Sequence, residues 1–224
     1  MLTVHHLDHS RSHRVLWLLE ELGVPYELEH YRRDAALRAP ESLRAIHPLG
    51  KAPVITDGTE TVAESGAIAE YIIERYGQGR LAPPVGTAEH LRYRYWMHYA
   101  EGSLMMPVVL MLIFRQMPKQ PMPMLARPVV RSLASSVIDT FVKPQIERHM
   151  AYVERELGKG PWFAGSEFTA ADIQMSFPLE TIAVRGGLAS WPSAASFVQR
   201  IRERPAYRRA IDKGGARDLA VLDG

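Results

Sequence analysis

Apolar and polar residues change their spacing twice within the first 31 residues. Residues 2–7 alternate between the two kinds, which predicts a strand. Over 11–22 the apolar residues recur at helical spacing, and Gly23 follows as a helix C-cap. Residues 26–31 alternate again. A strand, a helix and a strand this close together predict a right-handed βαβ unit.

Two further strands and two helices complete the first unit in the predicted pattern. A short helix can follow Pro40, and the turn signal Asp57–Gly58 joins a strand at 51–56 to one at 61–63. A helix over 66–76 follows, with Ser65 placed to cap it. The first unit therefore reads βαβαββα and is expected to span residues 1–78.

The rest of the chain carries helical patterns. Residues 79–88 form a Gly/Pro-rich linker, and 89–224 are expected to be all-helical. Pro107 predicts a kink in the first helix, and Pro144 predicts a bend in the second. The expected helices are 88–116, 129–157, 169–184 and 193–213, with a proline-rich loop at 118–128.

The amino-acid composition excludes several kinds of functional site. The chain has no Cys, which excludes disulfides, thiolate zinc sites, iron–sulfur clusters and a catalytic protein thiol, and which suits the cytoplasm. The longest apolar run, Leu104–Phe114, contains a proline and is too short to span a bilayer, so no membrane partner is expected.

The net charge of +2 is unevenly distributed. Residues 1–78 hold 8 Lys/Arg and 12 Asp/Glu, which leaves 19 and 13 for the remainder. Such a division indicates two units with different surfaces. The basic stretch around 200–209 is interpreted as a solvated helix face, and no nucleic-acid partner is expected.

Four segments together resemble the soluble glutathione S-transferase family. They are HHLDHSRSHRVLWLLEELG (5–23), HPLGKAPV (47–54), ESGAIAEYI (64–72) and FAGSEFTAADI (163–173). The Ser-Arg-Ser turn resembles a bacterial and fungal branch. The resemblance implies an α/β thioredoxin-like N-terminal domain and an all-α C-terminal domain that together bind glutathione.

The resemblance also implies a glutathione site. Pro53 stands where the family has a cis proline, which exposes the backbone of Ala52 to the cysteinyl part of glutathione. Lys51 can pair with the glycyl carboxylate. Glu64 can accept from the glutamyl ammonium, while the start of the helix that Ser65 caps favours the γ-glutamyl carboxylate.

The group that stabilises the glutathione thiolate is expected in the turn Asp8–Ser12. Ser10 is the first candidate, and Ser12 and His9 are the alternatives, since a hydroxyl donor or a nearby cation lowers a thiol pKa. Tyr is absent from residues 1–25, which disfavours the tyrosine-dependent classes.

The acceptor substrate is expected to be a small apolar electrophile. Met105, Met106 and Val109 would line its pocket, since methionine side chains adapt to varied ligands. Thr169 and Asp172 form a capping-box pattern, assigned to structure.

The predicted function is a homodimeric glutathione S-transferase that adds the thiolate to an electrophilic carbon. The alternatives are a glutathione-dependent peroxidase, isomerase or dehalogenase, and a non-catalytic binding module. No metal is expected, because His5 and His6 are neighbours on a strand and face opposite sides.

Overall fold

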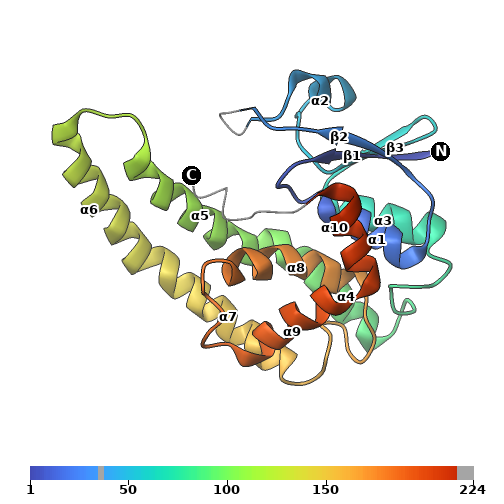
Figure 1. Ribbon diagram of the computed structural model, residues 1–224. Coiled ribbons are helices and arrows are strands. Elements are labelled where there is room, and N and C mark those ends of the chain that lie inside the picture. The colour runs from blue at the N-terminus through green and yellow to red at the C-terminus, as the bar shows by residue number, and fades with distance from the viewer. Residues whose placement is uncertain (35–37, 216–224) are drawn as a thin grey trace.

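The N-terminal unit has the predicted βαβαββα order. The structure is a computed structural model that describes residues 1–34 and 38–215 (Figure 1). The strands line up as β2-β1-β3-β4, with β1 parallel to β2 and antiparallel to β3. Helices α1 and α3 cover one side of the sheet and α2 the other (Figure 1). The elements are β1 Leu2–Leu7, α1 His13–Leu22, β2 Glu27–Tyr31, α2 Glu41–Ile46, β3 Val54–Asp57, β4 Glu60–Ala63 and α3 Ser65–Tyr76.

The second unit is built from helices, as predicted. Residues 77–87 connect it to α3. Helices α5 and α6 form a hairpin that projects away from the rest of the molecule (Figure 1). The α-helices are α4 Ala88–Tyr99, α5 Met105–Gln116, α6 Arg127–Val137, α7 Lys143–Leu157, α8 Ala170–Ala183, α9 Pro192–Glu203 and α10 Pro205–Gly214. Short turns join some of them: the π turns η1 Ala100–Leu104 and η4 Ile138–Val142, and the 3₁₀ turns η2 Met117–Lys119 and η3 Met124–Ala126.

Each of the two long helical stretches contains a π turn shortly before a proline. The irregularity near Pro107 precedes it, at η1, and η4 likewise precedes Pro144. A proline cannot donate to the carbonyl four residues back, and its ring presses on that carbonyl. In η1 the Met105 N–H instead reaches the carbonyl of Ala100, five residues back. The irregularity near Pro107 is therefore a widened turn before the proline, and the kink itself stays a prediction.

The single helix predicted over 193–213 is wrong, because the chain breaks between α9 and α10. Arg204 has φ −66° and ψ 130°, which is extended backbone. The residue before a proline is disfavoured in the helical region, and Pro205 follows directly. The resulting corner lets α10 turn back onto α1 of the first unit (Figure 1).

Helix α10 is held on α1 by packing and by ion pairs. Tyr207 packs edge-on against Trp17, with ring centres 5.1 Å apart. Arg204 donates twice to the Glu21 carboxylate, at 2.5 and 2.9 Å, and Arg209 donates to Glu20 at 2.8 Å. The basic C-terminal stretch is thus in part a docking surface for the acidic first unit, which corrects its interpretation as a solvated face.

The continuous helical stretch Ala88–Lys119 is 32 residues long and apolar enough, by length and composition, to cross a membrane. Core helices of proteins that live in water pass the same test. Trp96, Leu104 and Met105 of this stretch are buried against other elements of the protein. We therefore interpret it as a core helix.

The capping box at the start of α8 is present as predicted. The fully buried Asp172 carboxylate accepts the backbone N–H of Thr169 at 2.8 Å and that of Phe163 at 2.9 Å. Burial raises the pKa of Asp172 to about 7, although these hydrogen bonds act in the opposite direction. The box ties the loop before α8 to the helix start.

Candidate active site

A cavity of about 740 Å³ opens between the first unit and helices α5 and α8. Its walls come from the turn after β1, from the segment around α2, from the residues before β3, and from the two helices. Cavities at such domain junctions are the usual places for small-molecule sites. Among the predicted site residues, those that line it are His9, Ser10, Lys51, Ala52, Met105 and Val109.

The segment before β3 has the predicted geometry. The peptide bond between Ala52 and Pro53 is cis. Pro53 is buried, while Lys51 and Ala52 line the cavity. Within the described residues Lys51 makes no ion pair, so its ammonium can meet an anionic ligand.

Ser65 is held by a buried arginine and does not cap α3 with its side chain. It is the first helical residue, and the Ser65 hydroxyl accepts from Arg14 Nη2 at 2.8 Å. Arg14 also donates to the carbonyl of Gln174 at 2.9 Å and to Glu101 at 2.5 Å. The expected role of Ser65 as a side-chain N-cap is therefore wrong. Glu64, with φ 74°, occupies the N-cap position and is exposed.

Glu101 connects this cluster to the cavity. Its carboxylate lies 3.2 Å from Arg11 Nε and 2.5 Å from Arg14 Nη2. Burial alone would push the pKa of Glu101 upward, but the guanidinium groups of Arg14 and Arg11 outweigh it and the pKa is lowered. Sequence reasoning missed Arg14 and Glu101. Arg14 stands inside a recognised motif, whereas Glu101 reaches the site only through the η1 turn.

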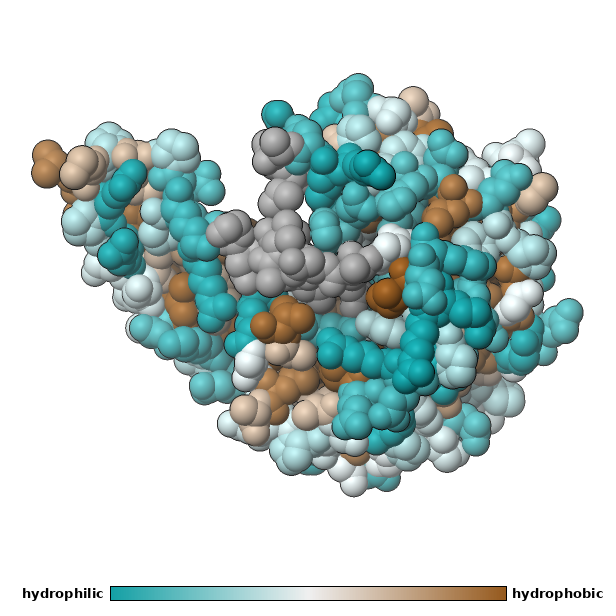
Figure 2. All heavy atoms as spheres, viewed as in Figure 1, coloured by the Kyte–Doolittle hydropathy of each residue, from teal (hydrophilic) through white to brown (hydrophobic). Residues whose placement is uncertain are grey.

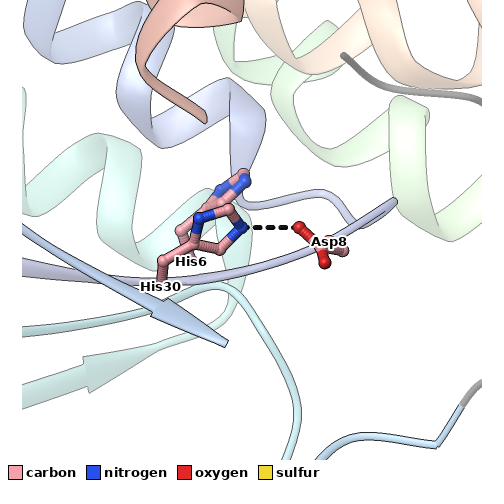
Figure 3. Close-up of side chains that lie close together, drawn as sticks. All are labelled: His6, Asp8 and His30. Carbon is pink, nitrogen blue, oxygen red and sulfur yellow. Dashed lines mark hydrogen bonds and ion pairs between the residues drawn. The ribbon is translucent and has the colours of Figure 1, made fainter. Parts of the chain in front are cut away.

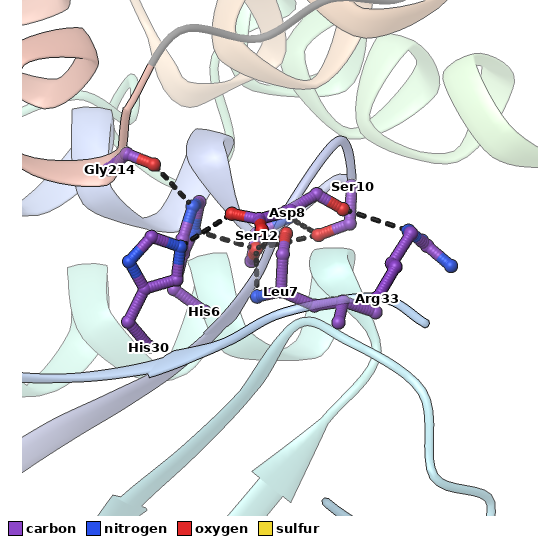
Figure 4. Close-up of polar contacts among 8 residues, drawn as sticks. All are labelled: His6, Leu7, Asp8, Ser10, Ser12, His30, Arg33 and Gly214. Atoms are coloured by element: carbon purple, nitrogen blue, oxygen red, sulfur yellow. Dashed lines mark hydrogen bonds and ion pairs between the residues drawn. The ribbon is translucent and has the colours of Figure 1, made fainter. Parts of the chain in front are cut away.

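The two serines of the turn lie in one hydrogen-bonded chain (Figure 4). Ser10 Oγ lies 2.7 Å from Ser12 Oγ, which lies 2.9 Å from His6 Nδ1. His6 Nε2 lies 2.9 Å from the carbonyl oxygen of Gly214, at the end of α10. Ser10 lines the cavity, whereas Ser12 is fully buried behind it. The position of Ser12 argues against direct contact with a ligand.

The direction of the protons along this chain follows from His6. Burial lowers the pKa of His6 to about 4, so the ring is neutral near pH 7 and carries one N–H. A carbonyl can only accept, so that N–H is at Nε2 and Nδ1 accepts from Ser12. Ser12 then has no proton left for Ser10, and Ser10 must donate to Ser12. The Ser10 hydroxyl can stabilise a thiolate once its O–H rotates from Ser12 toward the cavity.

A cluster of His6, Asp8 and His30 offers three ligand atoms within 4.8 Å of one another (Figure 3). His30 Nε2 already lies 2.5 Å from Asp8 Oδ1, and both ring nitrogens of His6 are engaged in the chain above. A metal ion would have to displace one of these bonds. His5 contacts Tyr31 and Thr56 instead and is not part of this cluster.

The cavity is more basic than the sequence suggested. Arg38 pairs with Asp34, and Arg44 pairs with Glu41, so these two cations are partly neutralised. Arg33 donates its Nε–H to the carbonyl of Asp8 at 2.9 Å. The arginines that line the cavity are Arg11, Arg33, Arg38 and Arg44. Arg11 lies in the turn where a nearby cation was expected, whereas Arg33, Arg38 and Arg44 were missed because an irregular polar segment gives no periodic signal of what it faces.

The opposite wall is apolar. Met105 and Val109 line it as predicted, together with Leu112 and Phe177. Met106 is 60% exposed and does not line the cavity, so its assignment to the acceptor pocket is not supported. Adjacent residues on a helix point about 100° apart, which explains why Met105 and Met106 diverge.

Fold and site together define a thioredoxin-like domain joined to a helical domain, with a basic and apolar cavity between them. The family model for the glutathione S-transferase N-terminal domain matches residues 1–74, and that for the C-terminal domain matches 125–209. The chain is 35% identical to glutathione S-transferase 3 of Schizosaccharomyces pombe, over 95% of this chain and 88% of the relative. It is 30% identical to glutathione S-transferase 1 of Saccharomyces cerevisiae, over 96% of both chains.

Solved structures agree with these relatives. A glutathione S-transferase from Actinobacillus pleuropneumoniae is 32% identical, with a TM-score of 0.79 over 98% of this chain and 96% of that one. A sphingomonad glutathione S-transferase complexed with glutathione shares the fold, with a TM-score of 0.71, 22% identity, and coverage of 95% and 98%. The chain belongs to the glutathione S-transferase family, and this membership supports glutathione transfer as its activity.

Proposed function

We propose that this protein ionises the thiol of glutathione and transfers the glutathionyl group to a small apolar electrophile. The observation that carries the proposal is the cavity, which joins Ser10, Lys51 and Ala52 on one wall to Met105, Val109 and Phe177 on the other. The glutathione-bound sphingomonad structure, which shares this fold, supports glutathione as the ligand.

Each end of glutathione has a proposed partner. The glycyl carboxylate pairs with Lys51, and the cysteinyl backbone pairs with Ala52 beside cis-Pro53. The γ-glutamyl group lies at the start of α3, where Glu64 accepts from its ammonium and the N–H groups near Ser65 favour its carboxylate. Arg14 is a positioning residue, because it fixes Ser65 without lining the cavity.

Ser10 is the proposed thiolate donor. Its side chain lines the cavity, and the N–H of Ser12 donates to its oxygen at 3.1 Å, which holds the hydroxyl in place. The guanidinium of Arg11 adds positive potential on the same wall. On binding, the thiol proton leaves to solvent. The sulfur then forms a bond to the electrophilic carbon, and the leaving group departs with its electron pair.

His9 is the alternative donor. It also lines the cavity, in the left-handed conformation with φ 50°. A protonated His9 would stabilise the thiolate as a cation, and a neutral one could donate a hydrogen bond. The variants Ser10→Ala, His9→Ala and Ser12→Ala separate these roles.

The test is calorimetric titration of glutathione in two buffers that differ in ionisation heat. We expect binding with proton release, and we expect Ser10→Ala to keep binding but to lose most of that release. Proton release lost in His9→Ala alone would reassign the donor. Binding without proton release would indicate a carrier, and no binding at millimolar glutathione would overturn the proposal. Turnover of a hydroperoxide without turnover of an aryl halide would favour the peroxidase alternative.

We further propose that the protein is a homodimer in the cytoplasm. Tyr95 on α4 is exposed next to the buried Trp96, so it remains available for a contact that Tyr93, which is buried, cannot make. Sedimentation equilibrium tests the dimer, and Tyr95→Ala tests the contact.

A further inference from the structure

The tip of the α5–α6 hairpin, residues 117–133, exposes apolar side chains that the fold does not use. Met124, Leu125, Val129 and Leu133 are 60 to 92% exposed. They stand at the end of a hairpin that projects from the body of the molecule (Figure 1). We call residues 117–133 the arm tip. Isolated exposed apolar residues are ordinary, whereas several within one short segment mark an interaction surface.

The charge of the hairpin has a single sign. Residues 102–138 contain four Lys/Arg and no Asp or Glu. Within the described residues Arg127 and Arg131 form no ion pair. On the surface of the hairpin, hydrophobic and hydrophilic residues stand side by side (Figure 2). The partner of this surface must therefore offer both negative charge and apolar material.

Helix α6 separates the two kinds of residue. Val129 and Leu133 lie four residues apart on α6, which places them in one row, and Leu125 precedes them by four residues in the η3 turn. Arg127 and Arg131 form a second row, offset by two residues and thus by about 200° around the helix. A basic face opposite an apolar face is typical of helices that lie in the headgroup region of a membrane.

We propose that the arm tip binds the surface of a membrane that contains anionic lipid. This inference goes beyond the proposed function, and it departs from the expectation that no membrane is a partner, which rested only on the lack of a spanning segment. A segment with apolar residues on one face and basic residues on the other can enter the headgroup layer of a bilayer.

Two other occupants fit less well. A second copy that pairs arm with arm across a two-fold axis would bring the same cations together, with no acid in the hairpin to balance them. A second copy that offers its acidic first unit to the arm is the alternative that sedimentation of the arm variants tests. Protein interfaces are enriched in aromatic residues, methionine and arginine, and residues 117–133 contain methionine and arginine but no aromatic anchor. An anionic lipid surface satisfies both the charge and the apolar row.

The experiment is co-sedimentation of the purified protein with phosphatidylcholine vesicles, with and without phosphatidylglycerol. We expect binding that requires phosphatidylglycerol and that weakens as salt is raised. The double variant M124S/L125S should reduce partitioning about tenfold or more, because two apolar insertions are lost. The double variant R127E/R131E should reduce it about tenfold or more and remove the preference for anionic vesicles.

Matched controls place the same changes elsewhere. Val85→Ser alters an equally exposed apolar residue outside the arm tip, and Arg208→Glu reverses an exposed cation on α10. Both should bind vesicles like the unaltered protein. Glutathione binding, measured in every variant, reports the fold, because residues 117–133 do not line the cavity. Vesicle binding is measured without glutathione, so the failure of this proposal and the failure of the proposed function are distinguishable.

Three outcomes would overturn the proposal. One is an absence of binding to anionic vesicles. Another is vesicle binding that neither arm variant weakens. The third is a change in the oligomeric state of M124S/L125S, measured by sedimentation equilibrium, without a change in its vesicle binding. That result would assign the arm tip to contact with a second copy of the chain.

Discussion

Two basic helical regions of this protein differ in whether their cationic side chains have ion-pair partners. On α10, Arg209 and Lys213 both contact the Glu20 carboxylate, and Tyr207 is buried against α1. On the arm tip, Arg127 and Arg131 have no ion pair among the described residues, and Leu125 is almost wholly exposed. Composition alone does not distinguish the two regions.

The difference comes from what each region faces. Helix α1 offers Glu20 and Glu21, so the acidic first unit supplies the counter-charges for α10. No such acid lies in residues 102–138. A cationic amphipathic helix thus packs against the first unit at α10 and remains exposed at the arm tip. Variants made in matched pairs, one on α10 and one on the arm tip, test this difference.

The largest effect is expected for Tyr207→Ala. The change removes the ring that packs on Trp17 and the hydroxyl that donates to Glu180 at 2.6 Å. We expect the free energy of unfolding to fall by about 4 kcal/mol, as for other buried aromatic residues. The matched change Leu125→Ala should cost less than about 0.5 kcal/mol. Urea unfolding measures both.

Tyr207→Phe refines the comparison. It keeps the ring and removes only the hydroxyl, so we expect a loss of about 1 kcal/mol. Equal losses in Tyr207→Ala and Leu125→Ala would contradict the division into a docked helix and a free arm.

Sequence patterns predicted the elements well where one local rule decided. Gly23 ends α1 in the left-handed conformation, and cis-Pro53 followed from the family resemblance. The break at Arg204 was missed because helical periodicity was given more weight than the proline that follows. Docking of α10 on α1 was also missed, since residues 189 positions apart carry no local signal of their contact.

A second prediction concerns His6, which bonds to Gly214 at the end of α10. Burial lowers the pKa of His6 from 6.5 to about 4. Between these values the unfolded chain binds a proton that the folded protein does not, so stability falls as the pH is lowered through this window. The loss should reach about 3 kcal/mol.

The measurement is urea unfolding at several pH values from neutral to about pH 4. His6→Asn should flatten the dependence in that window, whereas His98→Asn, on the exposed face of α4, should leave it unchanged. An unaltered slope in His6→Asn would show that other groups govern the acid response.

The candidate site was predictable in part. Motif residues such as Ser10, Lys51 and Ala52 do line the cavity. The proton order from Ser10 to His6 was not predictable, because it depends on the burial of His6 and on a carbonyl 208 residues away. The approach of Glu101 to Arg14 depends on a π turn that sequence periodicity does not reveal.

The smallest effect is expected for Arg209→Ala against Arg131→Ala. Arg209 donates to the Glu20 carboxylate at 2.8 Å and to its carbonyl at 3.0 Å, but its side chain is half exposed, so solvent weakens the pair. Burial pushes the pKa of Glu20 upward, yet hydrogen bonds from Lys213, Arg209 and Tyr26 outweigh it and the pKa is lowered. We expect Arg209→Ala to lower the free energy of unfolding by about 1 kcal/mol. The loss should be smaller in high salt, and smaller again once acid protonates Glu20.

Arg131→Ala should leave stability unchanged while it weakens binding to anionic vesicles, because a cation without an internal partner contributes to an external surface alone. The opposite pattern, with a stability loss only at Arg131, would mean that the arm is the docked region and α10 the free one.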